Sequence, residues 1–364
     1  MSEGRTYDAV IVGGGVIGLC SAWRLAQRGA RVAVLERGEP PAGATRVAAG
    51  MLAPVGELTF GEPELLELTL AASELYPGFV AELEQASAMP TGYEAPGALH
   101  VALDRDEAAE LRRVHGLQHS LGLDAEWLPP RGCRRLEPGL TPSLGGGVHA
   151  PGEGSIDPRA LTAALLAALA AEGAEVRSGT EVRGALLEGA RIVGVRTAAG
   201  EELRASSVVL ACGAWSGQAE WLPPNARPPV RPVKGQIVEL RTIDGSRPCE
   251  RILASERVYL VPRPRAGRLI VGATVEERGF DTTVTAGGVH ELLREAYRLL
   301  PEVAEMELVE AMAGLRPGTP DNLPIVGPGS LEGLILATGH YRNGILLAPL
   351  AAARVVEALD GVIA

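Results

Sequence analysis

The chain has 364 residues, of which 46% are hydrophobic and 22% are charged, values typical of a globular protein. It carries 34 lysines and arginines against 45 aspartates and glutamates, a formal net charge of −11, which argues against nucleic acid and against a polybasic membrane surface as partners. The length predicts two domains, or one enzyme with an inserted second lobe.

The sequence carries no signal for a membrane or for a metal. No stretch reaches the roughly 20 apolar residues of a spanning helix, and the glycines within Ala9 to Trp23 indicate a strand, turn and helix rather than a targeting segment. His115 and His119 lack an obvious third ligand. The cysteines form no CxxC pair and indicate reduced thiols: Cys20, Cys133, Cys212 and Cys249. We therefore predict a cytoplasmic protein without a metal site.

The most informative motif lies at the N-terminus. Ala9 to Val12 predict a buried strand, a helix follows from about Val16 to Arg28, and Val32 to Leu35 predict a second strand. Between the first strand and the helix stands GxGxxG, formed by Gly13, Gly15 and Gly18. Strand, glycines, helix and strand together predict a Rossmann-type dinucleotide site.

Each part of this motif has a mechanical role. Gly13 allows a tight turn, Gly15 lets the backbone approach a pyrophosphate, and Gly18 lets the helix pack closely on the strand. The helix N-terminus offers free N–H groups and a positive dipole end to phosphates. Glu36, after the second strand, is placed to accept hydrogen bonds from ribose hydroxyls and disfavours a 2′-phosphate, so NADP is not expected. The motif alone leaves NAD and FAD as alternatives.

The following segments predict two interleaved lobes. Ala44 to Pro54 is a loop of small residues, and residues 62–85 predict one or two helices, broken at Pro77–Gly78. Residues 90–150 predict a separate lobe of short strands and one helix. Asp157 and Pro158 then begin a helix, and a strand candidate follows at Val176 to Val182.

The second half of the chain predicts further segments of both lobes. "GARIVGVRTAAGEEL" predicts a hairpin, and residues 229–312 predict antiparallel strands with a helix over 287–300. The chain ends in a buried strand, a glycine turn and a long helix. "GLRPGTPDNLPIVG" carries one arginine, Arg316, which we interpret as held by a stiff loop of glycines and prolines.

Several stretches together resemble the D-amino-acid oxidase / glycine oxidase family of flavoproteins. They are "AAGML", "VKGQIVEL", "GRLIVGATVE", "AGLRPGTPDNLPIVG" and "ATGHYRNGILLAP", and with the N-terminal motif the resemblance covers about residues 7–357. It implies an α/β plus α+β fold: a Rossmann-type FAD-binding domain with an inserted antiparallel-sheet substrate domain. The FAD-binding domain would comprise residues 1–88, 150–226 and 314–364, and the substrate-binding domain residues 89–149 and 227–313.

The resemblance implies FAD as the cofactor, held without a covalent bond because no cysteine lies near "RPGTPD". The long last helix would direct its positive end at the flavin and stabilise its anionic reduced form. Besides the three motif glycines and Glu36, the cofactor-binding residues implied by the resemblance are Val16, Ile17, Arg37, Ala44, Thr45, Ala49, Gly50, Met51, Val182, His340, Tyr341, Arg342, Asn343, Gly344, Ile345 and Leu346.

The resemblance also implies a substrate site. Arg316 would bind a carboxylate through the planar fork of its guanidinium, with Arg342, Tyr259 and Met51 nearby. Two positions depart from the family pattern: Arg257 stands where some relatives have a histidine, and Val275 where one has a bulky methionine. We expect both to affect the size or charge of the pocket.

The implied reaction is the oxidative deamination of glycine, or of small amines such as sarcosine or D-alanine, to an oxo acid (glyoxylate from glycine), ammonia and hydrogen peroxide. A hydride would pass to flavin N5, without a catalytic base from the protein, and oxygen would be the second substrate. The implied setting is thiazole synthesis in thiamine biosynthesis, and the implied assembly a homotetramer. The alternatives are a D-amino-acid or sarcosine oxidase or dehydrogenase of broader specificity, and a non-catalytic dinucleotide-binding sensor.

Overall fold

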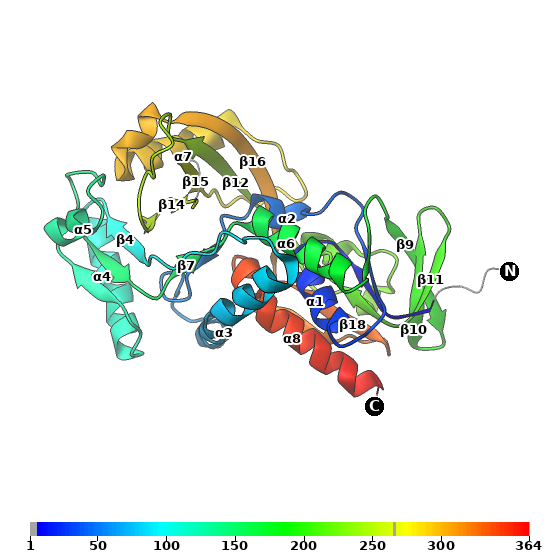
Figure 1. Cartoon of the computed structure of the whole chain (residues 1–364). Coiled ribbons are helices and arrows are strands. Elements are labelled where there is room, and N and C mark those ends of the chain that lie inside the picture. The colour runs from blue at the N-terminus through cyan, green and yellow to red at the C-terminus, as the bar shows by residue number, and fades with distance from the viewer. Residues whose placement is uncertain (1–5, 265–266, 364) are drawn as a thin grey trace.

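The computed structural model describes residues 6–264 and 267–363 and contains two large sheets (Figure 1); the outermost residues of the predicted FAD-binding domain lie outside this range. In the first sheet five parallel strands run in the order β18 (Leu334–Thr338), β11 (Glu202–Leu210), β1 (Thr6–Val12), β2 (Val32–Leu35) and β8 (Glu175–Arg177). The antiparallel β17 (Ile325–Pro328) forms one edge, and the hairpin of β9 (Val182–Glu188) and β10 (Arg191–Thr197) pairs with β11.

Helices cover one face of this sheet. Both faces need covering, because successive residues of its strands point to opposite faces and are apolar on each. Ala9 and Ile11 of β1 belong to the core shared with the helices, whereas Val10 and Val12 pack on the opposite face with residues of β9 to β11. The helices that contribute buried residues to the first core are α1 (Val16–Ala26), α3 (Pro63–Ser87), α6 (Pro158–Ala171) and α8 (Gly344–Ile363).

The second sheet has eight strands, with α7 (Ala286–Leu299) packed against it. Its order is β16 (Glu307–Gly318), β12 (Arg231–Arg241), β15 (Arg268–Gly272), β14 (Tyr259–Pro262), β13 (Ile252–Ala254), β4 (Ala98–Ala102), β6 (Gly146–Ala150) and β5 (Glu126–Leu128). The helices α4 (Arg105–Ser120) and α5 (Pro130–Leu136) pack beside β4 to β6, at the left of Figure 1. Short connecting elements are α2 (Gly43–Val47), β3 (Met51–Leu52) and β7 (Gly154–Ser155), with 3₁₀ turns at Gly213–Gln218, Pro224–Ala226 and Pro301–Glu305.

The predicted fold class is confirmed, but three details of the prediction are wrong. The α3 helix is continuous through Pro77, because Tyr76, Phe79 and Val80 are buried and the packing outweighs one lost backbone hydrogen bond. The strand predicted over residues 176–182 is two strands, separated by a turn with Gly179 at φ 63°. The second sheet is antiparallel except for β13 and β4, which pair in parallel.

The predicted domain boundary at residue 314 falls inside β16. Residues 307–318 pair with β12 along their whole length, so Arg316 lies opposite Val233 on a strand of the second sheet. The expected stiff loop is therefore wrong for this residue. A strand paired with β12 holds the arginine instead, and Pro317 is accommodated near the end of this edge strand.

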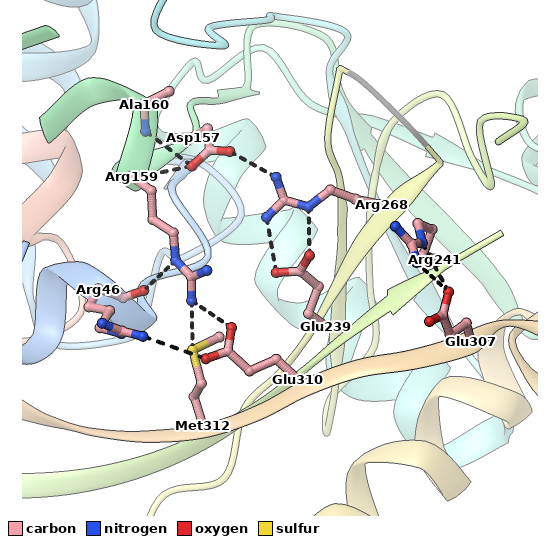
Figure 2. A network of polar contacts seen from close by, with 10 residues as sticks. All are labelled: Arg46, Asp157, Arg159, Ala160, Glu239, Arg241, Arg268, Glu307, Glu310 and Met312. Atoms are coloured by element: carbon pink, nitrogen blue, oxygen red, sulfur yellow. Dashed lines mark hydrogen bonds and ion pairs between the residues drawn. The ribbon is translucent and has the colours of Figure 1, made fainter. Parts of the chain in front are cut away.

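A polar network connects the start of α6 to the second sheet (Figure 2). Asp157 caps α6 by accepting the Arg159 backbone N–H at 2.9 Å, and its other oxygen lies 3.6 Å from Nη1 of Arg268 on β15. Arg268 donates to both carboxylate oxygens of Glu239 on β12, at 2.6 and 3.0 Å. The side chain of Arg159 reaches Glu310 on β16 at 2.9 Å. The start of α6 is thus connected, directly or through Arg268, to three strands of the second sheet.

Candidate functional site

A cavity of about 720 Å³ lies where the two sheets meet. Its lining includes the carboxyl ends of four parallel strands: Val12 and Gly13 at the end of β1, Leu35 and Glu36 at the end of β2, Ala211 and Cys212 after β11, and Ala337 and Thr338 on β18. In open α/β sheets ligands bind outside these ends, where the strand order reverses. The second sheet supplies the opposite wall through β12, β14 and β16, with Gly235, Tyr259 and Arg316 among its residues.

The three motif glycines each meet a different steric demand. A Cβ at Gly13, whose φ is 117°, would lie 2.3 Å from the Ala211 carbonyl oxygen, and a Cβ at Gly18 would lie 2.0 Å from the Gly13 carbonyl oxygen. Gly18 does not line the cavity, so its role is close packing of the helix on the strand. Gly15 faces the cavity at the start of α1 and offers no side-chain cap of its own. The Val16 N–H donates to Thr45 Oγ1 at 3.1 Å, and the helix N-terminus beside it suits a phosphate.

Glu36 is held in place by the backbone. Its two carboxylate oxygens accept the N–H groups of Gly14 at 2.7 Å and Gly38 at 2.9 Å, and the residue is 7% exposed. Arg37 follows it and places its guanidinium 4.2 Å from the ring centroid of Trp215, which also lines the cavity. This end of the cavity combines a fixed carboxylate, an aromatic plane and a cation.

Arg316 projects from β16 on the same face as Met312 and Gly314, because alternate residues of a strand share a face. Its Nη1 donates to the carbonyl oxygens of Thr274 at 3.1 Å and Lys234 at 3.4 Å. The structure shows no carboxylate paired with it among the residues described. The backbone therefore orients the guanidinium while its charge stays uncompensated.

Tyr259 lies beside this arginine. Its ring covers Gly272, the residue opposite it on β15, where an added Cβ would be 2.4 Å from the phenol oxygen. Burial raises the pKa of the Tyr259 phenol; Glu57 acts in the same direction, and Arg316 and Arg342 oppose it. The phenol therefore stays protonated at neutral pH and can donate a hydrogen bond into the cavity.

Arg342 differs from Arg316 because it already has a carboxylate partner. Its Nε and Nη2 donate to the two oxygens of Glu57 at 2.9 and 3.1 Å. The negative charge of Glu57 raises the pKa of the Arg342 guanidinium. Its predicted contact with substrate stays a prediction, with the added finding that two of its donors are occupied.

The α8 helix begins at the cavity. Its preceding turn is fixed by the Tyr341 N–H, which donates to the Pro317 carbonyl at 3.0 Å, and by the Asn343 N–H, which donates to the His340 carbonyl at 2.9 Å. Burial lowers the pKa of His340 to about 3, so its ring is neutral at pH 7. Within the described chain, Nε2 of this ring has no hydrogen-bond partner. The positive end of the helix dipole favours electron-rich ligand atoms here, and the neutral ring does not oppose them.

Most predicted site residues come together around this one cavity. Of the predicted residues, Gly18 and Leu346 do not line it, and Leu346 packs into the first core at 1% exposure. Arg257 is exposed on the surface and Val275 is 60% exposed, and neither lines the cavity, so the expectation that they shape it is wrong.

Sequence reasoning missed Glu57, Trp215 and Gly235, which all line the cavity. The position of Trp215, just after the carboxyl end of a buried strand, was a usable signal. Cys212 also lies there, with its pKa raised to about 12 by burial, so it is a neutral thiol. The described residues contain no group of three or more metal-ligating side chains, and no helix among them is long and apolar enough to cross a membrane.

The family model described as FAD-dependent oxidoreductase, DAO, matches residues 8–358, and the chain therefore belongs to this family. FAD is its cofactor, and the helix N-terminus, the glycine cradle and the fixed Glu36 carboxylate fit a dinucleotide. Glycine oxidases are among the relatives that this chain resembles.

A glycine oxidase of Geobacillus kaustophilus is 35% identical, with 97% of this chain and 93% of the relative covered. The crystal structure of that species' glycine oxidase superposes with a TM-score of 0.90, over 98% of this chain and 95% of the other. The bifunctional protein ThiO/ThiG of Trichormus variabilis is 39% identical over 97% of this chain. The chain spans about half the length of that relative, 52%. The structure of an iminodiacetate oxidase of Chelativorans sp. BNC1 superposes with a TM-score of 0.87 at 28% identity, over 97% of this chain and 95% of the other.

Proposed function

We propose that the protein oxidises the Cα–N bond of glycine, with oxygen as the second substrate, and releases glyoxylate, ammonia and hydrogen peroxide. The observation that carries this proposal is Arg316, an uncompensated guanidinium oriented by two backbone carbonyls in the cavity of a dinucleotide motif. The full-length likeness to glycine oxidases supports it. In the overall balance, glycine, water and oxygen give glyoxylate, ammonia and peroxide.

The residues of this chain contribute placement rather than proton transfer. Arg316 binds the carboxylate through its planar fork and so fixes the position of the neighbouring Cα. Tyr259 donates its phenol proton as a hydrogen bond beside it, and Met51 and Ile237 give the cavity an apolar wall. When bound, FAD supplies the two-electron acceptor for the Cα–N bond. His340 is buried and neutral, so its ring adds no positive charge that would repel a protonated amine.

The test compares the wild-type protein with Arg316→Ala in air, with glycine as substrate and peroxide and glyoxylate as readouts. Removing one partner of a desolvated charge pair costs about 2–5 kcal/mol, so kcat/KM for glycine should fall by at least about 30-fold. The variant should retain FAD, because the dinucleotide motif is untouched. Unchanged kcat/KM in an FAD-containing variant would show that Arg316 is not the anchor.

A substrate panel separates the alternatives. Faster peroxide formation from sarcosine or D-alanine than from glycine would indicate an oxidase of broader specificity. Flavin reduction by glycine with little peroxide would indicate a dehydrogenase. Bound FAD with no turnover of any amine would indicate a non-catalytic sensor.

The cellular setting extends the same proposal. Oxidation of glycine passes through an imine. The proposed setting is the supply of this imine to thiazole synthesis for thiamine, and the likeness to proteins named ThiO/ThiG supports it. A cytoplasmic homotetramer stays a prediction from the resemblance. Light scattering on the purified holoprotein measures the number of subunits.

A further inference from the structure

Two arginines line the cavity near Tyr259, and only one of them, Arg342, is paired with a carboxylate among the described residues. Four arginines line the cavity in all: Arg37, Arg183, Arg316 and Arg342. Within the described chain, Arg183 pairs with Glu181 and Arg342 with Glu57, whereas Arg37 lies over Trp215. Near Tyr259 the cavity therefore offers one charged fork, that of Arg316, to an anionic substrate.

Glu57 is held firmly in this position. Its backbone N–H donates to the Ala53 carbonyl at 3.0 Å, and the side-chain amide of Gln118 donates to the Val55 carbonyl at 3.0 Å. The N–H of Gly56 donates to the Glu153 carboxylate, which is 1% exposed. The turn that carries Glu57 is thus fixed from behind by residues of α4 and of the β6–β7 connection. The Glu57 side chain is 19% exposed and its carboxylate is paired with Arg342, so it is not a free surface acid.

The three charged groups lie close enough together to act on one phenol. Arg316, Arg342 and Glu57 all line the cavity together with Tyr259. The N–H of Tyr341, next to Arg342, donates to the carbonyl oxygen of Pro317, next to Arg316, at 3.0 Å. The three groups also all influence the ionisation of Tyr259. A substrate bound to Arg316 beside Tyr259 would therefore meet the Glu57–Arg342 pair next. A second carboxylate on that substrate would find two donors of the Arg342 fork occupied, and it would be repelled by Glu57.

We propose that Glu57 is a specificity-determining residue: by occupying Arg342 it restricts the cavity to amines with one anionic group. The proposal rests on the proposed function, since it assumes that Arg316 binds the substrate carboxylate. It predicts that removing the charge of Glu57 turns Arg342 into a second anion site. The matching substrates are amino acids with a second carboxylate, of which iminodiacetate is the simplest N-substituted glycine.

The test compares glycine and iminodiacetate in the wild-type protein and in Glu57→Gln. Oxidation of one Cα–N bond of iminodiacetate, with oxygen reduced to peroxide and water consumed, gives glyoxylate and glycine, so initial rates are needed. The ratio of kcat/KM for iminodiacetate to that for glycine should rise at least about tenfold, equivalent to one modest charge contact. The matched control is Glu188→Gln, which removes the same charge from the exposed pair with Arg204 at 2.9 Å. It should leave the ratio unchanged.

The double variant Glu57→Gln/Arg342→Gln identifies the residue through which Glu57 acts. If Arg342 is the released anion site, the double variant should lose the gain and return near the wild-type ratio. A gain that survives in the double variant would overturn the proposal. So would an unchanged ratio in a folded, FAD-containing Glu57→Gln protein.

A binding measurement keeps this inference independent of turnover. Acetate and oxydiacetate, which has an ether oxygen in place of the amine, are titrated against the bound flavin while its absorbance is followed. In Glu57→Gln the Kd of oxydiacetate should fall at least about tenfold relative to the Kd of acetate. Absence of glycine oxidation by the wild type would refute the proposed function but would leave this titration able to decide the role of Glu57. Equal effects on both acids would refute the role of Glu57.

Discussion

The guanidinium of Arg316 lies across Gly235 on the neighbouring strand. A Cβ added at Gly235 would come within 2.3 Å of Nη1 and 2.6 Å of Cζ of Arg316. Gly235 lies opposite Gly314 on β16, and Arg316 lies two residues further along that strand. The absence of a side chain on β12 therefore creates the space in which the cation rests.

Gly235→Ala should displace this guanidinium. The clash is with the far end of a flexible side chain, so the strand can stay in place while Arg316 moves. A misplacement of about 1 Å in a positioning group can cost about 100-fold, so kcat/KM for glycine should fall by about 10- to 100-fold. Steady-state peroxide assays measure the change. Gly184→Ala on β9, where the new Cβ would lie 3.4 Å from the Arg196 Cβ, is the control; an equal loss in both would argue against displacement.

Arg316→Lys should keep part of the activity that Arg316→Ala loses. Lysine retains the positive charge but lacks the planar fork that two carboxylate oxygens can share. We expect kcat/KM for glycine to fall about tenfold relative to wild type and to exceed that of the alanine variant. If lysine and alanine are equally impaired, geometry rather than charge controls binding.

Two glycines of the N-terminal motif should respond differently to alanine. At Gly18 the new Cβ meets a backbone oxygen at 2.0 Å, so overpacking should lower the free energy of unfolding by about 1–3 kcal/mol. At Gly15 the nearest atom is Thr45 Oγ1 at 3.3 Å, so the apoprotein should remain nearly as stable, but the methyl group should obstruct the dinucleotide. Urea unfolding and FAD titration by flavin fluorescence separate the two effects. Loss of stability without loss of FAD affinity in Gly15→Ala would contradict the assignment.

His340 should make the fold sensitive to acid. Burial lowers its pKa from 6.5 to about 3, so between these values the unfolded state binds a proton that the folded state does not. Stability therefore falls as pH decreases below about 6.5 and is unaffected by this group above it; the loss at pH 5 is about 2 kcal/mol. His340→Gln should unfold with a weaker dependence on pH between 7.5 and 5.0 in urea titrations of the apoprotein. The exposed His119→Gln is the control, and identical slopes in all three proteins would contradict the prediction.

The first two strands of the first sheet and the dinucleotide site between them could be predicted from local patterns. Short apolar runs, the glycine spacing and Glu36 each depend on residues close together in the sequence, so they predict local structure. The site of Arg316 was also recognisable, but its glycines and prolines indicated a loop. Pairing with β12 overrides that composition, and strand pairing between distant segments is not visible in a local window.

Glu57 could not be predicted for the same reason. It lies 285 residues before its partner Arg342, in a segment whose sequence is otherwise small and apolar. The exposure of Val275 and Arg257 likewise depends on how the strand ends turn relative to the cavity. Such features depend on the meeting of two sheets, and only the folded chain determines them.

The placement of Arg316 on a paired strand limits how the protein can evolve. A strand changes register only in whole residues, and side chains return to the same face only every second residue. The smallest permitted relocation of the anchor along β16 is thus about 7 Å, too large for a gradual adjustment to a longer or shorter substrate. New substrates must then be accommodated by exchanging the side chains around a fixed cation, so diversification at this site is expected to proceed by substitution of its neighbours.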